Sequence, residues 1–341
     1  MNEQLFLYTA VALGISLALT PIMQRLARKF GIMDHPGGRK NHKEPTPYGG
    51  GIAIFVAFMA VFLLVGKTGS EYLGFLLCAI IIHITGIVDD KRGMHAMPKL
   101  IMQAIAAVVA IGFGLQFDMS MILKGNLENF QYLAIPLTFA WIIGIINAIN
   151  LIDGLDGLAG GVSMIAAFTL AIVSWLNGDT TVAILSLGLG AAALGFLPYN
   201  LKSKIFMGDA GSMFLGYSLA TLSILGSVKL ATAFSVLVPI TILLIPIFDT
   251  LFAILRRLLR RKSIFSGDRQ HFHHRLIDLG LTSLQAVSVI YAFSLVLSVL
   301  AVYSTQVRAR TGYILFGISL LILFSFTSVV VYLHQRKTNG I

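Results

Sequence analysis

Long apolar segments separated by short polar ones run the length of the chain. Segments of about 18 or more mostly apolar residues are long enough to cross a membrane as a helix. The longest polar interval, 256–283, is too short for a separate soluble domain. The pattern predicts an all-α integral membrane protein, with a single polytopic domain over residues 1–341. Its eleven expected spans are 5–24, 49–66, 72–88, 98–117, 132–149, 157–176, 181–198, 211–228, 232–255, 284–303 and 313–333.

Composition supports this pattern. The chain is 57% hydrophobic and 12% charged, whereas about a quarter of the residues in a soluble domain are charged. The first span lacks a preceding basic region and is too long for a cleaved signal peptide, so we expect it to remain as a helix. The lone cysteine, Cys78, has no partner for an internal disulfide, which argues against redox chemistry.

Basic residues orient the spans, because Lys and Arg accumulate on the cytoplasmic side. With the N-terminus outside and the C-terminus in the cytoplasm, 20 of the 25 Lys and Arg residues lie inside. The net charge of +10 follows from this bias. No element for reading nucleic acid is evident, and a basic face suits anionic lipid head groups and phosphorylated substrates.

Polar motifs occupy all five expected cytoplasmic loops, while the outer loops look like plain connectors. This one-sided arrangement favours a site at the cytoplasmic membrane interface over a cation or nucleotide-sugar transporter, whose polar groups would lie near the midplane. The loops contain "DHPGGRKNHKEPTPYGGG" (34–51), "GIVDDKRGMHAMPK" (86–99), "NAINLIDGLDGLAGG" (147–161), "KSKIFMGDAGSMFLG" (202–216) and "SIFSGDRQHFHHRL" (263–276).

Aspartates at the expected helix ends are the strongest chemical signal. A carboxylate at mid-bilayer costs about 2.5–3.5 kcal/mol, and several held close together repel one another. A divalent cation would relieve that repulsion, and oxygen donors without cysteine suit Mg²⁺ or Mn²⁺. The residues are Asp89, Asp90, Asp153, Asp156 and Asp209.

The motif "NLIDGLDGLAGG" spaces Asn150, Asp153 and Asp156 at i, i+3 and i+6. If the helix continues through them, the three side chains share one of its faces. The alternative is an acidic loop in which Asp156 caps the next helix. In "VDDK", Asp89 and Asp90 point about 100° apart on a helix. One could therefore bind metal while the other acts as base or nucleophile, unless both are merely solvated helix-end acids.

The motif "GDAGS" places Asp209 at a glycine-flanked helix start, where free N–H groups could meet an anion. A metal carrying phosphate would also fit there, and a simple N-cap role for Asp209 is the alternative.

The motif "RQHFHHRL" sets three histidines between two arginines. This favours a phosphate or sugar site over zinc, which would more often involve cysteine, or over a solvated basic loop. The basic cluster at 39–43 is either a phosphate site or an ordinary juxtamembrane loop. Asp249 is more readily explained as a structural buried acid.

Taken together, these five loops resemble those of the polyprenyl-phosphate N-acetylhexosamine-1-phosphate transferase family. The resemblance covers nearly the whole chain, with the motifs in order. Its members include the enzymes that start teichoic acid, enterobacterial common antigen and O-antigen synthesis. The phospho-N-acetylmuramoyl-pentapeptide transferase is related to them.

The resemblance implies a Mg²⁺- or Mn²⁺-dependent enzyme of the bacterial cytoplasmic membrane. UDP-N-acetylhexosamine would give its sugar-1-phosphate to undecaprenyl phosphate, and UMP would leave. Exchange of one phosphoanhydride for another depends mainly on positioning and charge neutralisation. The product would open a cell-wall or surface polysaccharide pathway. Membrane lipids are further partners, and the sequence allows a homodimer without specifying the oligomeric state.

The resemblance also implies residue roles. Asp89 and Asp90 would be the catalytic pair, and Asp209, with Asp153 and Asp156, would bind the metal. Asn150 would help to hold the nucleotide. The remaining substrate contacts would come from basic or histidine side chains: Lys99, Arg39, Lys40, His42, Arg269, His271, His273 and His274.

The last loop and "RKNHKEPTP" are similar to those of N-acetylglucosamine-type enzymes, so we expect UDP-GlcNAc as donor. UDP-MurNAc-pentapeptide or another UDP-N-acetylhexosamine is the alternative. Direct attack by the lipid phosphate and a covalent intermediate on Asp89 or Asp90 both fit these residues.

Overall fold

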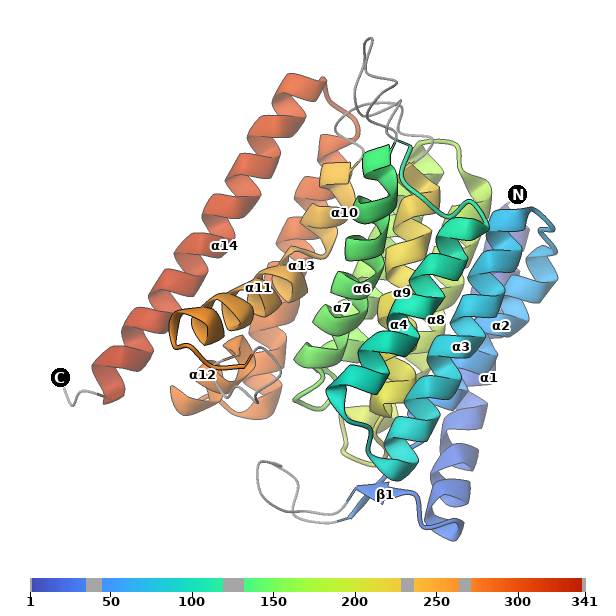
Figure 1. Cartoon of the computed structure of the whole chain (residues 1–341), viewed down its shortest axis with the longest axis horizontal. Coiled ribbons are helices and arrows are strands. Elements are labelled where there is room, and N and C mark those ends of the chain that lie inside the picture. Colours follow the sequence, from blue (N-terminus) through green and yellow to red (C-terminus); the bar gives the residue numbers. More distant parts are fainter. Residues whose placement is uncertain (1, 35–44, 119–131, 228–235, 264–270, 339–341) are drawn as a thin grey trace.

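The computed structural model describes residues 2–34, 45–118, 132–227, 236–263 and 271–338. Helices dominate this part (Figure 1), with one antiparallel strand pair, β1 (Met33–Asp34) and β2 (Thr46–Pro47). The helices are α1 (Asn2–Lys29), α2 (Gly50–Val65), α3 (Ser70–Arg92), α4 (Ala96–Gly112), α6 (Ala134–Ile152), α7 (Leu158–Leu176), α8 (Thr180–Asn200), α9 (Gly208–Ser227), α10 (Leu237–Ile242), α11 (Leu244–Leu259), α12 (Phe272–Asp278), α13 (Ser283–Ser304) and α14 (Ala309–Thr338).

Eight of these helices are long and apolar enough to cross a membrane: α1, α3, α6, α7, α8, α9, α13 and α14. Helices α2 and α4 are apolar but shorter. A multi-pass helical membrane protein is therefore confirmed, whereas the count of eleven spans and the outward N-terminus stay predictions.

The expected continuous span 232–255 is wrong. The chain breaks at Leu243 into α10 and α11. Pro246 explains the break, because its ring would clash with the carbonyl group of Ile242, where α10 ends. Helix α11 then runs strongly tilted relative to α6 and α13 (Figure 1).

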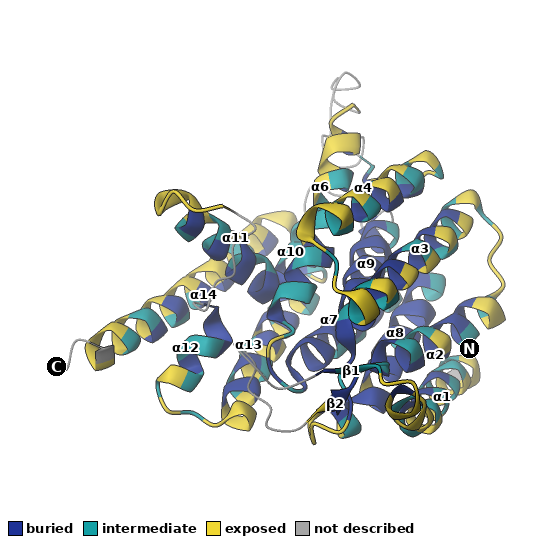
Figure 2. Cartoon of the chain, turned by 60° about the horizontal axis from the view of Figure 1, so that its bottom comes forward, coloured by how far each residue is buried: buried dark blue, intermediate teal, exposed yellow. Residues whose placement is uncertain are grey.

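Helix α9 forms the centre of the bundle and is buried along nearly its whole length. It packs against α2, α3, α6, α7 and α8, while α1 and α14 are largely exposed (Figure 2). Glycines permit the close approach of these helices. A Cβ on Gly86 of α3 would lie only 2.3 Å from the Cα of Ala210, so the end of α3 meets the start of α9.

The segment before α2 is joined to the segment before α9. Phe206 N–H donates to Pro47 at 2.9 Å, and Gly50 N–H donates to Phe206 at 3.0 Å. These backbone bonds place Tyr48 beside Phe206, with ring centroids 6.2 Å apart. One end of α9 is thus fixed next to the strand pair.

Candidate active site

A cavity of about 970 Å³ lies where α3, α6 and α9 present their polar ends. It is lined by all five aspartates expected from the sequence, namely Asp89, Asp90, Asp153, Asp156 and Asp209. Asn150 and His274 also line it. The cavity therefore draws residues from all five quoted loop motifs, although their individual roles stay predictions.

Asp90 binds the start of α9. Its Oδ1 accepts the backbone N–H of Asp209 at 2.7 Å, and its Oδ2 accepts that of Ala210 at 3.2 Å. The expectation that these N–H groups are free for a substrate anion is wrong, because a carboxylate of the protein occupies them. Gly208 is required here, since its φ is +70° and a Cβ would lie 2.3 Å from the Asp90 carboxylate.

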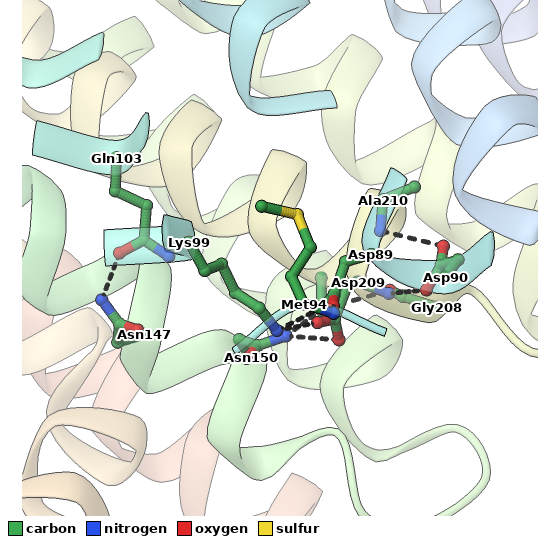
Figure 3. Close-up of polar contacts among 11 residues, drawn as sticks. Asp89, Asp90, Met94, Lys99, Gln103, Asn147, Asn150, Gly208, Asp209 and Ala210 are labelled. Atoms are coloured by element: carbon green, nitrogen blue, oxygen red, sulfur yellow. Dashed lines mark hydrogen bonds and ion pairs between the residues drawn. The ribbon is translucent and has the colours of Figure 1, made fainter. Parts of the chain in front are cut away.

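Lys99 of α4 joins two other acids. Its Nζ forms ion pairs with Asp89 and with Asp209 (Figure 3). The Met94 backbone N–H also donates to Asp89. The expected contact of Lys99 with substrate stays a prediction; in this structure its ammonium group neutralises two carboxylates.

Asn150 completes this network from α6. Its Nδ2 donates to Asp209 Oδ1 at 2.9 Å and to Ser212 Oγ at 2.8 Å. One helical turn away, Asn147 donates to Gln103 Oε1 at 2.6 Å (Figure 3), which ties α6 to α4. The site is therefore braced by side chains from α3, α4, α6 and α9.

Asp153 and Asp156 do not share a helix face with Asn150, so that expectation is wrong. Helix α6 ends at Ile152 with Asp153 as its C-cap, and α7 begins after Gly157, whose φ is +82°. The alternative that Asp156 caps α7 is also wrong, because Gly157 holds the N-cap position. Asp156 instead accepts a hydrogen bond from the Ser203 hydroxyl.

The surroundings of Asp153 in this loop disfavour an ionised carboxylate that has no cation beside it. Burial raises the pKa of Asp153 well above its ordinary value, and the nearby negative charge of Asp209 raises that pKa further. A cation arriving at this side of the cavity would favour the ionised carboxylate.

The three histidines differ in their surroundings. His271 and His273 are 4% and 2% exposed, whereas His274 is half-buried and lines the cavity. Burial, with the neighbouring His274, lowers the pKa of His273 to about 3, which keeps this ring neutral. The expected sites Arg269, Arg39, Lys40 and His42 lie outside the described residues.

Several further side chains line the cavity, although the sequence does not single them out as site residues: Asp34, Tyr48, Asn200, Ser203 and Phe206. Tyr48 and Phe206 lie within two of the quoted motifs, but only the pairing of their segments shows that both face one cavity. Burial raises the pKa of Tyr48, as does its hydrogen bond with Asp34. Asn200 accepts the Gly157 N–H at 2.8 Å and thereby positions the aspartate loop.

Known proteins resemble this chain over most of its length. The profile of glycosyl transferase family 4 matches residues 72–227. A Bacillus subtilis (strain 168) protein named "Probable undecaprenyl-phosphate N-acetylglucosaminyl 1-phosphate transferase" is 43% identical, with 92% of this chain and 88% of the relative covered.

Two more distant relatives have similar names. The "Undecaprenyl-phosphate alpha-N-acetylglucosaminyl 1-phosphate transferase" of Escherichia coli O157:H7 is 31% identical, over 93% of this chain and 88% of the relative. The "Decaprenyl-phosphate N-acetylglucosaminephosphotransferase" of Mycobacterium leprae (strain TN) is 31% identical, over 99% and 92%. The chain therefore belongs to glycosyl transferase family 4, the polyprenyl-phosphate N-acetylhexosamine-1-phosphate transferases that its motifs resemble.

Proposed function

We propose that the protein transfers GlcNAc-1-phosphate from UDP-GlcNAc to undecaprenyl phosphate. An oxygen of the lipid phosphate bonds to the sugar-linked phosphorus, the bond to the uridine-linked phosphate breaks, and UMP leaves. The observation that carries this proposal is the acidic cavity at the ends of membrane helices, in a chain whose relatives bear the names given above. Such a place allows a water-soluble nucleotide sugar to meet a lipid phosphate.

The carboxylate oxygens of the cavity fit Mg²⁺ as a metal that would bind together with the nucleotide sugar. Within the described ranges, no three His, Cys, Asp or Glu side chains form a ready-made metal site. Mg²⁺ commonly uses one or two carboxylates together with substrate phosphates, rather than a cage made only of protein. Asp209 and Asp153 would supply those carboxylates, and the bound ion would neutralise charge that develops on the diphosphate.

The protein's own side chains can supply the remaining functions. Lys99 holds Asp89 and Asp209 together despite their like charges. The rings of Tyr48 and Phe206 offer an aromatic wall that suits a nucleobase. Both Asp90 oxygens are engaged by α9, which favours direct attack by the lipid phosphate over a covalent intermediate on that residue.

We place this site at the cytoplasmic face of a bacterial cytoplasmic membrane. The distribution of basic residues supports the orientation, because 20 of 25 fall on that side in the expected topology. UDP-sugars are made in the cytoplasm, so the same orientation would expose the cavity to the donor.

Purified protein should convert radiolabelled UDP-GlcNAc and undecaprenyl phosphate into an organic-extractable product when Mg²⁺ is present. EDTA and Asp209→Asn are the controls, and each should remove the product. Transfer from UDP-MurNAc-pentapeptide alone would overturn the proposed donor. Movement of UDP-GlcNAc into liposomes without chemical change would support a transporter instead.

A further inference from the structure

Asp249 is a buried acid that the proposed reaction does not yet use. It lies in α11 and is 3% exposed. Its Oδ2 binds His271 Nδ1 at 2.8 Å, and its Oδ1 accepts the Phe272 backbone N–H at 3.1 Å. Burying a carboxylate is costly unless it is well paired. Both of its oxygens bind groups at the start of α12, so this carboxylate anchors that end of the helix.

The polar contacts at the other end of α12 lie at the surface. There His334 Nε2 lies 3.2 Å from Asp278 Oδ2, and Lys337 Nζ donates to the Asp278 carbonyl at 2.8 Å. These groups are exposed, and exposed pairs contribute little to stability. Asp249 therefore gives the start of α12 a buried polar attachment, in addition to the apolar packing of Phe272 and Leu276.

The residues that follow connect α12 to the aspartate loop. His273 Nε2 is buried, with no hydrogen-bond partner within the described structure. A Cβ placed on Gly154 would lie 2.4 Å from this Nε2 atom. Gly154 stands between Asp153 and Asp156, and the next residue of α12, His274, lines the cavity. The position of α12 thus affects the cavity in two places, at the aspartate loop beside Gly154 and at His274.

We propose that Asp249 is a positioning residue: it fixes the start of α12, so that His273 packs against Gly154 and His274 reaches the cavity. Helix α11, which begins after the break at Leu243, carries Asp249 to its contact with His271. The inference rests on the proposed function, because its effect is measured on the same transfer. Asp249 touches no substrate in this scheme and acts through α12.

Asp249→Asn tests the carboxylate with little change in shape. An amide has a single acceptor oxygen, whereas Asp249 meets His271 and Phe272 with separate oxygens, so one of the two contacts must change. We expect KM for UDP-GlcNAc to rise about tenfold, as for loss of a charged hydrogen bond, while KM for undecaprenyl phosphate and kcat change little. Asp278→Asn, at the exposed end of α12, is the matched control and should leave KM unchanged.

The packing step has its own test in a double-mutant cycle. Gly154→Ala should lower kcat/KM by at least about tenfold, because its Cβ would collide with His273. Adding His273→Ala should recover part of that loss. Gly144→Ala is the control, since no atom lies within 4 Å of its added Cβ. Purely additive losses from the two substitutions would show that the residues act separately.

A third readout does not depend on turnover. In protein with ¹⁵N-labelled histidine, Asp249→Asn should shift the His271 ring proton from Nδ1 to Nε2, so that the ring accepts from the new amide. Absence of UDP-GlcNAc transfer by the wild type would overturn the proposed function, and this readout would still test the Asp249–His271 contact. An active wild type, with unchanged KM and an unchanged ring tautomer in the variant, would overturn the positioning role alone.

Discussion

The carboxylate of Asp90 accepts the backbone N–H of Asp209 at 2.7 Å and thereby joins the last turn of α3 to the first turn of α9. A second bond, from Ala210 N–H at 3.2 Å, makes this a two-point attachment. A negative charge at the positive end of the α9 dipole is favourable. Asp90 thus determines where Asp209 stands, even before any substrate binds.

Asp90→Asn should therefore reduce both stability and activity. The amide supplies one acceptor for two N–H donors and no charge for the helix dipole. We expect a loss of about 1 kcal/mol in the free energy of unfolding and about 100-fold in turnover, because the site is displaced. Thermal unfolding and radiolabel transfer would measure these effects. Asp156→Asn is the comparison, and it should impair transfer without lowering the melting temperature; equal melting temperatures for both variants would contradict the attachment.

Gly86→Ala should separate the same two helices. The added Cβ would lie 2.3 Å from the Cα of Ala210, and this backbone atom cannot rotate away. Overpacking of this kind costs about 1–3 kcal/mol, and turnover should fall with it. Gly112→Ala in α4 has no atom within 4 Å of its Cβ and should behave like the wild type. Normal turnover in Gly86→Ala would mean that the end of α3 need not meet α9 closely.

Lys99→Gln removes the positive charge between Asp89 and Asp209. Turnover should fall about 100-fold or more, as for other charge-stabilising groups in active sites. The two acids, no longer neutralised, should bind Mn²⁺ more tightly, which calorimetry can measure. Lys67→Gln, an exposed site far along the sequence, is the control. Weaker Mn²⁺ binding in Lys99→Gln would show that the lysine and the metal do not compete for these carboxylates.

His273 predicts a specific pH dependence of stability. Its pKa is lowered from 6.5 to about 3 in the folded protein. The neutral ring is favoured by folding, so its contribution is complete above pH 6.5 and declines as the pH falls toward 3. Between pH 6.5 and 4.5, the melting temperature of His273→Phe should therefore fall less than that of the wild type. His334→Gln, at a partly exposed position, should keep the wild-type slope; an identical slope in all three proteins would refute a buried neutral His273.

The sequence predicted those features that depend on local pattern. Apolar length located the membrane helices, and helix-end aspartates located the cavity that they line. Features that depend on contacts between distant segments were missed or wrong. The pairing of Asp90 with α9 joins residues 119 positions apart, and no spacing within either motif reveals it.

Two further errors have local causes that periodicity hides. Glycines interrupt the helix between Asp153 and Gly157. Residues at the i, i+3, i+6 spacing therefore do not lie on one helix face. Pro246 divided an apolar segment that hydropathy alone makes continuous. The contact of His271 with Asp249 joins residues 22 positions apart, so no local spacing reveals it.

The burial of α9 keeps the helix that carries Asp209 away from direct contact with lipid. Changes in bilayer thickness act through helices that meet lipid, by tilt and mismatch, and α1 and α14 are the least buried of the eight candidate spans. Helix α9, which begins with Gly208 and Asp209, has almost no outward surface on which lipid can press. The position of Asp209 should thus change little between membranes of different composition, so that the centre of the site persists while its lipid environment varies.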